Sequence, residues 1–406
     1  MDWFGLIKGT VFGEPPRYVH KTKEAGMTEI PKPTVFSWLW SAPTVLFTSP
    51  NGVWAGISMF MYWACPYDTT VMSVAAIAPL SIGFFIERLP IWMGLVLGYT
   101  SFWHTSLYWF DMASRPFVRG RTYSLDKLFH NMAWTTSGIV IWTGFENIMC
   151  YLWATGRLAY ISDWDSFNTS VGFLKLVVAL MAVPVWRSVH FYFAHRFLHY
   201  GPMYQQVHSL HHRNTDVEPF SGLCMHPVEH LYYFACILPN LLFVCSPFAL
   251  MWNGVHLLLS PAASHSGYED HFQSDAFHYF HHRYFECNYA GTDAAFMDIF
   301  FGTFKGKFTE EEPKPREDAK SSLKIMPTTE FIGYLVGSVA CVASGIPLVV
   351  GFGPVVLATV LWFFGSGRGV QPVKMGVLAN LLHLGMGTLF CSVPIAYMSW
   401  LLAGSS

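Results

Sequence analysis

The sequence predicts an all-α, polytopic integral membrane protein, in which a helical bundle carries a histidine-rich cap for two metal ions facing the cytosol. Composition is the first of three observations behind this prediction: 52% of the 406 residues are hydrophobic and only 12% are charged, against about 25% charged in an ordinary soluble domain. The second is a series of apolar runs, and the third is a dense group of histidines. The net charge of −2 gives no general basic field, so no nucleic-acid partner is expected.

Apolar runs occur on both sides of the histidine region. A membrane-spanning helix needs roughly 20 apolar residues. The candidate spans are 53–65 (a short one), 70–86, 89–110, 134–156 and 171–193, then a hairpin of 229–250 and 252–264, and finally 329–364 and 375–402. Glycines and prolines interrupt 329–364, which favours two short spans there.

These runs divide the chain into successive regions. We expect an N-terminal cytosolic or interfacial segment (1–52), transmembrane helices (53–193), a histidine-box region with a membrane hairpin at 229–264 (194–304), a charged linker (305–325) and additional C-terminal transmembrane helices (326–406).

Two loops indicate the orientation in the membrane. The segment 111–132 is rich in arginine and lysine, which the positive-inside tendency places in the cytosol. A glycosylation sequon at 168–170 falls in the loop that this orientation puts on the opposite side. Both signals place the chain from His195 onward on the cytosolic face.

Fourteen of the eighteen histidines lie between His190 and His282. Three boxes, HRFLH at 195–199, HSLHH at 208–212 and HYFHH at 278–282, pair histidines three or four residues apart, which places them on one helical face. Such pairs on neighbouring helices can enclose two metal ions. The candidate ligands are His195, His199, His208, His211, His212, His226, His265, His278, His281 and His282.

The type of ligand limits which metal ions the site is expected to bind. Neutral imidazole suits iron, copper, zinc and nickel, whereas a structural zinc needs only about four ligands, often thiolates. The eight cysteines are scattered and form no CxxC pair, so a disulfide framework or thiolate site is not expected. Around the boxes, Glu229 and Glu269 are candidates to orient imidazoles through the second ring nitrogen, and Tyr268 and Asn288 are candidates to line the site.

The boxes resemble those of the fatty acid hydroxylase/sterol desaturase superfamily, the membrane di-iron oxygenases. HRFLH followed by HSLHH is similar to the first two boxes of the sterol branch, and MHPVEH at 225–230 to its His-Pro segment. HSGYE at 265–269 is similar to a stretch in C-4 methyl oxidases, and HYFHHRYFECNYAG at 278–291 to the last box of C-5 desaturases. The resemblance covers about 130–305.

The resemblance implies a catalytic region at 194–304 that binds two iron ions and uses O2 as co-substrate to desaturate, hydroxylate or epoxidise a membrane lipid, with a sterol or sterol precursor expected. It also implies an external electron donor, such as cytochrome b5 with its reductase, and an endoplasmic reticulum membrane. The chain departs from the family by carrying Arg187-Ser188-Val189 before His190, where an acidic residue is common, and by continuing for a hundred residues after the last box.

Alternatives stay open at this stage. Within the superfamily they are squalene epoxidation, fatty acyl or sphingolipid hydroxylation, and ether-lipid monooxygenation. Outside it, a metal transporter would place its ligands in mid-membrane, and a catalytically dead scaffold would be expected to lose box residues, although every box here is intact.

Overall fold

The computed structural model describes residue 30 and residues 50–113, 115–118, 125–161, 169–269, 274–291, 295–307 and 377–403. Several expectations lie outside these residues: most of the N-terminal segment, Asn168 of the sequon, most of the charged linker and the apolar run 329–364. The described residues are helical, with one isolated β-bridge between Pro116 and Tyr268. This confirms the predicted all-α class.

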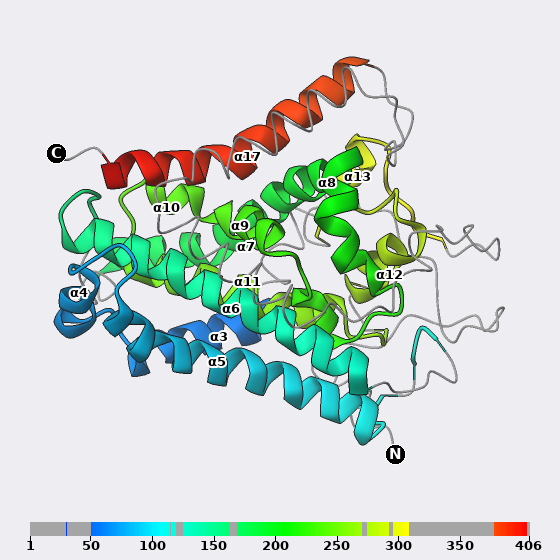
Figure 1. The fold of residues 1–406 in the computed structure, drawn as a ribbon, viewed down its shortest axis with the longest axis horizontal. Helices are drawn as coiled ribbons and strands as arrows, with labels where there is room; N and C mark the ends of the chain where they lie inside the picture. Colours follow the sequence, from blue (N-terminus) through cyan, green and yellow to red (C-terminus); the bar gives the residue numbers. More distant parts are fainter. Residues whose placement is uncertain are drawn as a thin grey trace.

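Long helices form the body of the molecule (Figure 1). In chain order they are α3 (Pro50–Ala64), α5 (Ile82–His104) with a π-helical turn (Thr105–Trp109), α6 (Leu125–Ala154), α7 (Ser170–Leu198), α11 (Pro247–Ser264) and α17 (Val377–Ala403), and the short helix α4 (Thr69–Ala75) stands between α3 and α5 in the chain. Helices α5 and α6 run side by side along one edge, α3 packs on α11, and α17 lies along α7 at the opposite edge.

Short elements gather at the end where the histidines lie (Figure 1). These are α8 (Gly201–Gln206), two 3-10 turns (His208–Arg213 and Pro219–Leu223), α12 (Ser274–Tyr284) and α13 (Ala295–Phe300). The hairpin expected at 229–264 consists of α9 (Pro227–Phe234), a 3-10 turn (Ala235–Ile237), α10 (Leu238–Leu242) and α11.

Three described helices are long and apolar enough to cross a membrane: Ile82–Trp109, Ser170–Leu198 and Leu381–Ala403. The second and third agree with the runs at 171–193 and 375–402. The division into separate spans at 70–86 and 89–110 is wrong, because α4 ends at Ala75 and one continuous helix follows from Ile82. The chain is anchored at this break, where the Ser81 amide donates to Asn147 Oδ1 of α6 (2.6 Å).

The run 134–156 belongs to α6, whose side chains are mostly buried inside the protein. Its centre holds Glu146, which is fully buried and lies 2.7 Å from the guanidinium of Arg88 in α5. Tyr67 and Trp92 donate further hydrogen bonds of 2.7 Å to the same carboxylate. A buried carboxylate is tolerated when it is paired and hydrogen-bonded in this way, and the network fixes α6 against α5.

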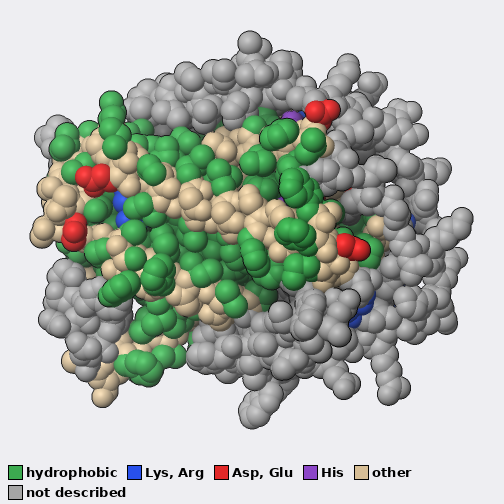
Figure 2. Space-filling view, turned by 90° about the horizontal axis from the view of Figure 1, so that it is seen from below, with side chains coloured by type: hydrophobic (Ala, Val, Ile, Leu, Met, Phe, Trp, Pro, Cys, Tyr) green, Lys and Arg blue, Asp and Glu red, His purple; other side chains and the backbone are tan. Residues whose placement is uncertain are grey.

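The outer surface is strongly apolar. In the described part of the face shown in Figure 2, hydrophobic side chains predominate and few charged groups lie among them. Exposed large side chains include Phe60 and Trp63 of α3, Ile82 and Ile86 of α5, and Phe173 of α7. Continuous apolar surface on this scale is unusual for a soluble protein, and it agrees with an integral membrane protein whose long helices face lipid.

Candidate metal centre

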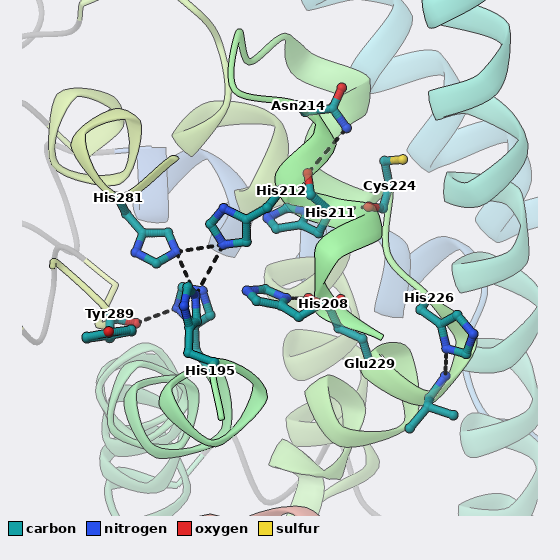
Figure 3. Close-up of polar contacts among 12 residues, drawn as sticks. His195, His208, His211, His212, Asn214, Cys224, His226, Glu229, His281 and Tyr289 are labelled. Carbon is teal, nitrogen blue, oxygen red and sulfur yellow. Dashed lines mark hydrogen bonds and ion pairs between the residues drawn. The ribbon is translucent and has the colours of Figure 1, made fainter. Parts of the chain in front are cut away.

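Four segments bring nine of the ten candidate histidines together at one end of the bundle. His195 and His199 come from the end of α7, and the 3-10 turn after α8 supplies His208, His211 and His212. His265 follows the last residue of α11, and α12 supplies His278, His281 and His282. Figure 3 shows several of these rings pointing toward one another from different helices.

The first cluster consists of His195, His199, His208, His212 and His281. All five are buried, and their potential ligand nitrogens lie within 4.8 Å of one another. The Nε2 atoms of His199, His212 and His281 form a triangle with sides of 3.2, 3.2 and 3.0 Å. Imidazole–metal bonds of about 2.1 Å set at right angles would place neighbouring nitrogens about 3 Å apart.

The second cluster consists of His211, His265, His278 and His282, which are also buried and within 4.8 Å of one another. His265 Nε2 lies 3.3 Å from His211 Nε2 and 3.0 Å from His282 Nε2. The two clusters adjoin, because the rings of His212 and His282 stack at 4.8 Å and those of His278 and His281 at 5.4 Å.

The opposite ring nitrogens are held by oxygen acceptors. Nδ1 of His195 bonds to the Tyr289 carbonyl (2.8 Å) and Nδ1 of His281 to the Cys287 carbonyl (2.7 Å). Nδ1 of His265 bonds to the Pro261 carbonyl (2.8 Å), and His211 and His208 have similar bonds to the Cys224 carbonyl and Glu229. Because a carbonyl can only accept, Nδ1 carries the proton and Nε2 keeps its lone pair.

Several of these lone pairs are buried without a partner. Nε2 of His195, His208 and His278 makes no hydrogen bond within the described residues. A buried unsatisfied polar atom costs about 1–3 kcal/mol, and burial lowers the pKa of His208 to about 3 and that of His211 to about 4. Neutral imidazoles with convergent, unsatisfied acceptor nitrogens form a donor set that fits metal ions.

Glu229, one of the predicted orienting residues, contacts the first cluster directly. Its Oε1 lies 2.8 Å from Nδ1 of His208, and both side chains are buried. Burial raises the pKa of Glu229 to about 8, while nearby His211 opposes this shift. One proton between Oε1 and Nδ1 satisfies both groups, and this hydrogen bond aims His208 Nε2 into the cluster.

The structure places the other four predicted residues differently. His226 lies outside both clusters, where its Nδ1 accepts the Val228 amide (3.2 Å) and caps α9; Figure 3 shows it apart from the cluster rings. The Tyr268 hydroxyl donates to the Leu107 carbonyl (2.9 Å). The Glu269 amide donates to the Arg115 carbonyl (3.0 Å).

Asn288 holds the backbone behind the last box. Its φ of 52° lies in the left-handed region that Asn tolerates better than most residues. Its amide donates to the carbonyls of Phe277 and Lys305, and its oxygen accepts the Lys305 amide. These bonds shape the loop that supplies the Cys287 and Tyr289 carbonyls.

Tyr289 is a site residue that we did not predict. Besides its carbonyl bond to His195, its buried ring lies 5.0–5.8 Å from the rings of His195, His199 and His281. Its hydroxyl donates to Glu286 (2.6 Å). The ECNYAG segment at 286–291 was visible after the last box, but nothing in its pattern showed that its carbonyls would support imidazoles.

Fold and site together define an integral membrane protein with a buried polyhistidine centre of metal-binding type. Residues 180–303 match the fatty acid hydroxylase family. This histidine-rich region of the chain is therefore similar to the fatty acid hydroxylase family, and the relatives that match it are named as a sterol desaturase and methylsterol monooxygenases, in keeping with the resemblance to the sterol branch.

Two relatives illustrate the similarity. A Delta(7)-sterol 5(6)-desaturase of Gibberella zeae is 26% identical over 156 residues, covering 35% of this chain and 46% of the relative. Methylsterol monooxygenase 1 of Gallus gallus is 31% identical over 122 residues, covering 28% of this chain and 41% of the relative. The chain thus spans about half the length of the curated relatives it matches. No solved structure matches the chain.

Proposed function

We propose that this protein is a membrane-bound non-haem di-iron oxidoreductase that uses O2 to desaturate, hydroxylate or epoxidise a membrane lipid, with a sterol or sterol precursor as substrate. The observation that carries this proposal is the arrangement of nine buried histidines in two adjoining clusters. The names of the relatives, a sterol desaturase and methylsterol monooxygenases, support the substrate class.

The five-histidine and four-histidine clusters would each hold one ion through Nε2 atoms. The chemistry that two bound iron ions would supply is reduction of O2 to an oxidant strong enough to attack an unactivated C–H bond or an alkene. The protein's own residues then bind and orient: carbonyl acceptors and Glu229 fix the rings, and the buried side chain of Tyr289, with the partly buried side chain of Phe191, limits the access of water to them.

Electron supply is part of the proposal. Desaturation removes two hydrogens from the lipid and reduces O2 to two waters, which requires two further electrons and two protons. We propose that an external donor of the cytochrome b5 type, with its reductase, docks on the cytosolic side of the histidine region, and that the membrane is the endoplasmic reticulum. The predicted catalytic region at 194–304 and the cytosolic orientation of the site belong to the same proposal.

The test uses the intact chain expressed in yeast membranes, beside a His281→Ala variant. Lipids are profiled by mass spectrometry, and iron in the purified protein is measured by elemental analysis. The proposal expects about two iron ions per chain and a sterol or squalene species changed by two hydrogens or one oxygen only with the unaltered protein. Identical lipid profiles despite bound iron and a reductase would refute sterol oxidation, and absence of iron would refute the di-iron assignment.

A further inference from the structure

Arg187 is a cation inside a helix that is long and apolar enough to span a membrane. It lies in Ser170–Leu198, eleven residues before the end of that span. Ionisable residues within membrane spans are costly and generally functional. Within the described residues no carboxylate pairs with it, and its buried Nε has no hydrogen-bond partner.

Arg187 lies on the side of α7 that leads to the clusters. Arg187, Phe191 and His195 are spaced four residues apart and share one helical face. The guanidinium carbon lies 5.3 Å from the Phe191 ring centre, and the Phe191 ring stacks on His195 at 4.6 Å. Phe191 also lies 6.3 Å from the ring of His278, so it touches one histidine of each cluster.

Two other elements bracket the guanidinium. Its Nη2 donates to the Tyr233 hydroxyl of α9 (2.8 Å), which itself donates to the Leu257 carbonyl of α11 (2.9 Å). On another side lies the backbone of Gly291, where an added Cβ would come 3.5 Å from Nη1 and 3.0 Å from Ser188 Oγ. Ser188 Oγ is buried and also lacks a hydrogen-bond partner.

Among the described residues no anion pairs with Arg187, so its donors beside the histidine clusters are available to an acceptor on a ligand. A guanidinium presents several N–H donors in a fixed plane and binds oxygen acceptors well. Tyr233 takes one donor and fixes the group in place, while Nε and Nη1 remain for a ligand. An apolar lipid with one oxygen at its end has the matching chemistry.

We propose that Arg187 and Tyr233 bind the oxygen at the polar end of the lipid substrate, with the rest of the lipid passing Phe191 to the histidine clusters. This inference rests on the proposed function and deepens it. By way of the Phe191 ring, the guanidinium carbon lies at most about 10 Å from the centre of the His195 ring. The Phe191 ring therefore separates the oxidised carbon from the bound oxygen.

With the substrate held in this way, the position oxidised on the lipid differs from the position named for the sterol desaturase relative. Positions 5 and 6, named for the Gibberella zeae relative, lie close to the 3-hydroxyl of a sterol. A sterol held by that hydroxyl at Arg187 presents its far end to the clusters instead. A fatty acid held by its carboxyl group would present a carbon well along its chain.

The test measures binding of lipid pairs that differ only in the terminal oxygen. Purified protein in nanodiscs is titrated with radiolabelled cholesterol and 5α-cholestane, and with radiolabelled palmitic acid and hexadecane, and bound lipid is counted. We expect the oxygenated member of one pair to bind at least about tenfold more tightly, as one charge-assisted hydrogen bond allows. The pair that discriminates identifies a hydroxyl or a carboxyl group as the ligand.

Substitutions on α7 test whether Arg187 causes the preference for the oxygenated lipid. Arg187→Met keeps an unbranched apolar stem but removes the guanidinium, and is expected to abolish the tenfold preference without changing the affinity for the hydrocarbon. Arg187→Lys keeps the positive charge and is expected to retain part of the preference for the oxygenated lipid. Lys175→Met removes a charge from an exposed position three turns earlier on α7 and should leave the preference intact.

The outcomes separate this inference from the proposed function. Iron content is measured on every sample: iron retained in Arg187→Met shows that the variant is folded around its metal centre. Equal binding within both lipid pairs by the unaltered protein, or a preference that survives Arg187→Met, overturns the inference. Protein that discriminates between lipids but holds no iron overturns only the di-iron proposal.

Discussion

His211 and His212 are neighbours in the chain, yet their imidazoles belong to different clusters. His211 Nε2 lies 3.3 Å from His265 Nε2, whereas His212 Nε2 lies 3.0 Å from His281 Nε2. His281 and His282 divide in the same way. Each HH pair therefore joins the two clusters through a single peptide unit, so the two clusters form one structural unit.

This division predicts selective metal loss. His211→Ala removes a ligand from the four-histidine cluster alone, so we expect the purified protein to retain roughly half of its iron. His226→Ala is the matched control, because His226 caps α9 outside both clusters and its loss should leave the iron content unchanged. Elemental analysis with protein quantitation measures both. Iron lost from His226→Ala as fully as from His211→Ala would contradict the assignment of ligands.

Glu229 orients His208 through a 2.8 Å contact to Nδ1, so Glu229→Gln should weaken metal binding rather than folding. Replacing partners of metal-bound histidines typically lowers metal affinity 10–100-fold. Competition with a chelator measures the affinity, and thermal unfolding of the apoprotein measures stability. An unchanged chelator titration in Glu229→Gln would show that the carboxylate does not act on the metal site.

Asp298 anchors the loop that supports His195. Its carboxylate accepts the amides of Tyr289 (2.9 Å) and Ala290 (2.8 Å) and the Thr303 hydroxyl (2.6 Å). Burial raises its pKa from 3.8 to about 6, although these hydrogen bonds oppose the shift. Between these two values the folded protein binds more protons than the unfolded chain, so this group's contribution to stability falls as pH rises from about 4 to about 6.

Asp298→Asn removes the titrating carboxyl group and so tests its contribution to the pH dependence of stability. Relative to the variant, the unaltered protein should lose up to about 3 kcal/mol of unfolding free energy across this window, since one pKa unit corresponds to about 1.4 kcal/mol. Urea unfolding in detergent at pH 4 and pH 6.5 measures the difference. A difference between the two proteins that does not depend on pH would contradict the raised pKa.

The C-terminal helix α17 is part of the support of the first histidine box. Gly387 lies so close to α7 that an added Cβ would come 2.6 Å from Phe197 Cβ, between His195 and His199 in sequence. Gly387→Val should therefore push the helices apart and destabilise the protein by about 1–3 kcal/mol. It should also lower the iron content, because the first box moves.

Gly385→Ala provides the matched control on the same helix, since a Cβ there meets nothing within 4 Å. It should be neutral or slightly stabilising, because alanine favours helix more than glycine does. Thermal unfolding and iron content are measured for both variants. Equal behaviour of Gly387→Val and Gly385→Ala would show that α17 does not pack against the box.

The sequence by itself determined the helical class, the long apolar helices at 171–193 and 375–402, and the three histidine boxes. Local spacing is sufficient for these features, because helical periodicity places residues three and four apart on one face and apolar length sets what can cross a membrane. The same logic singled out Glu229, which stands next to a box in the chain and beside it in space.

Only the tertiary structure decided which histidine belongs to which cluster. Nothing in the sequence separates His226 from the other nine, since whether an imidazole reaches the centre depends on how α9 packs, not on its own spacing. The break at Ser81 depends on Asn147 of another helix. The Tyr289 carbonyl reaches His195 through a loop held by Asp298. Contacts between residues far apart in the chain arise from packing, and local sequence patterns do not predict them.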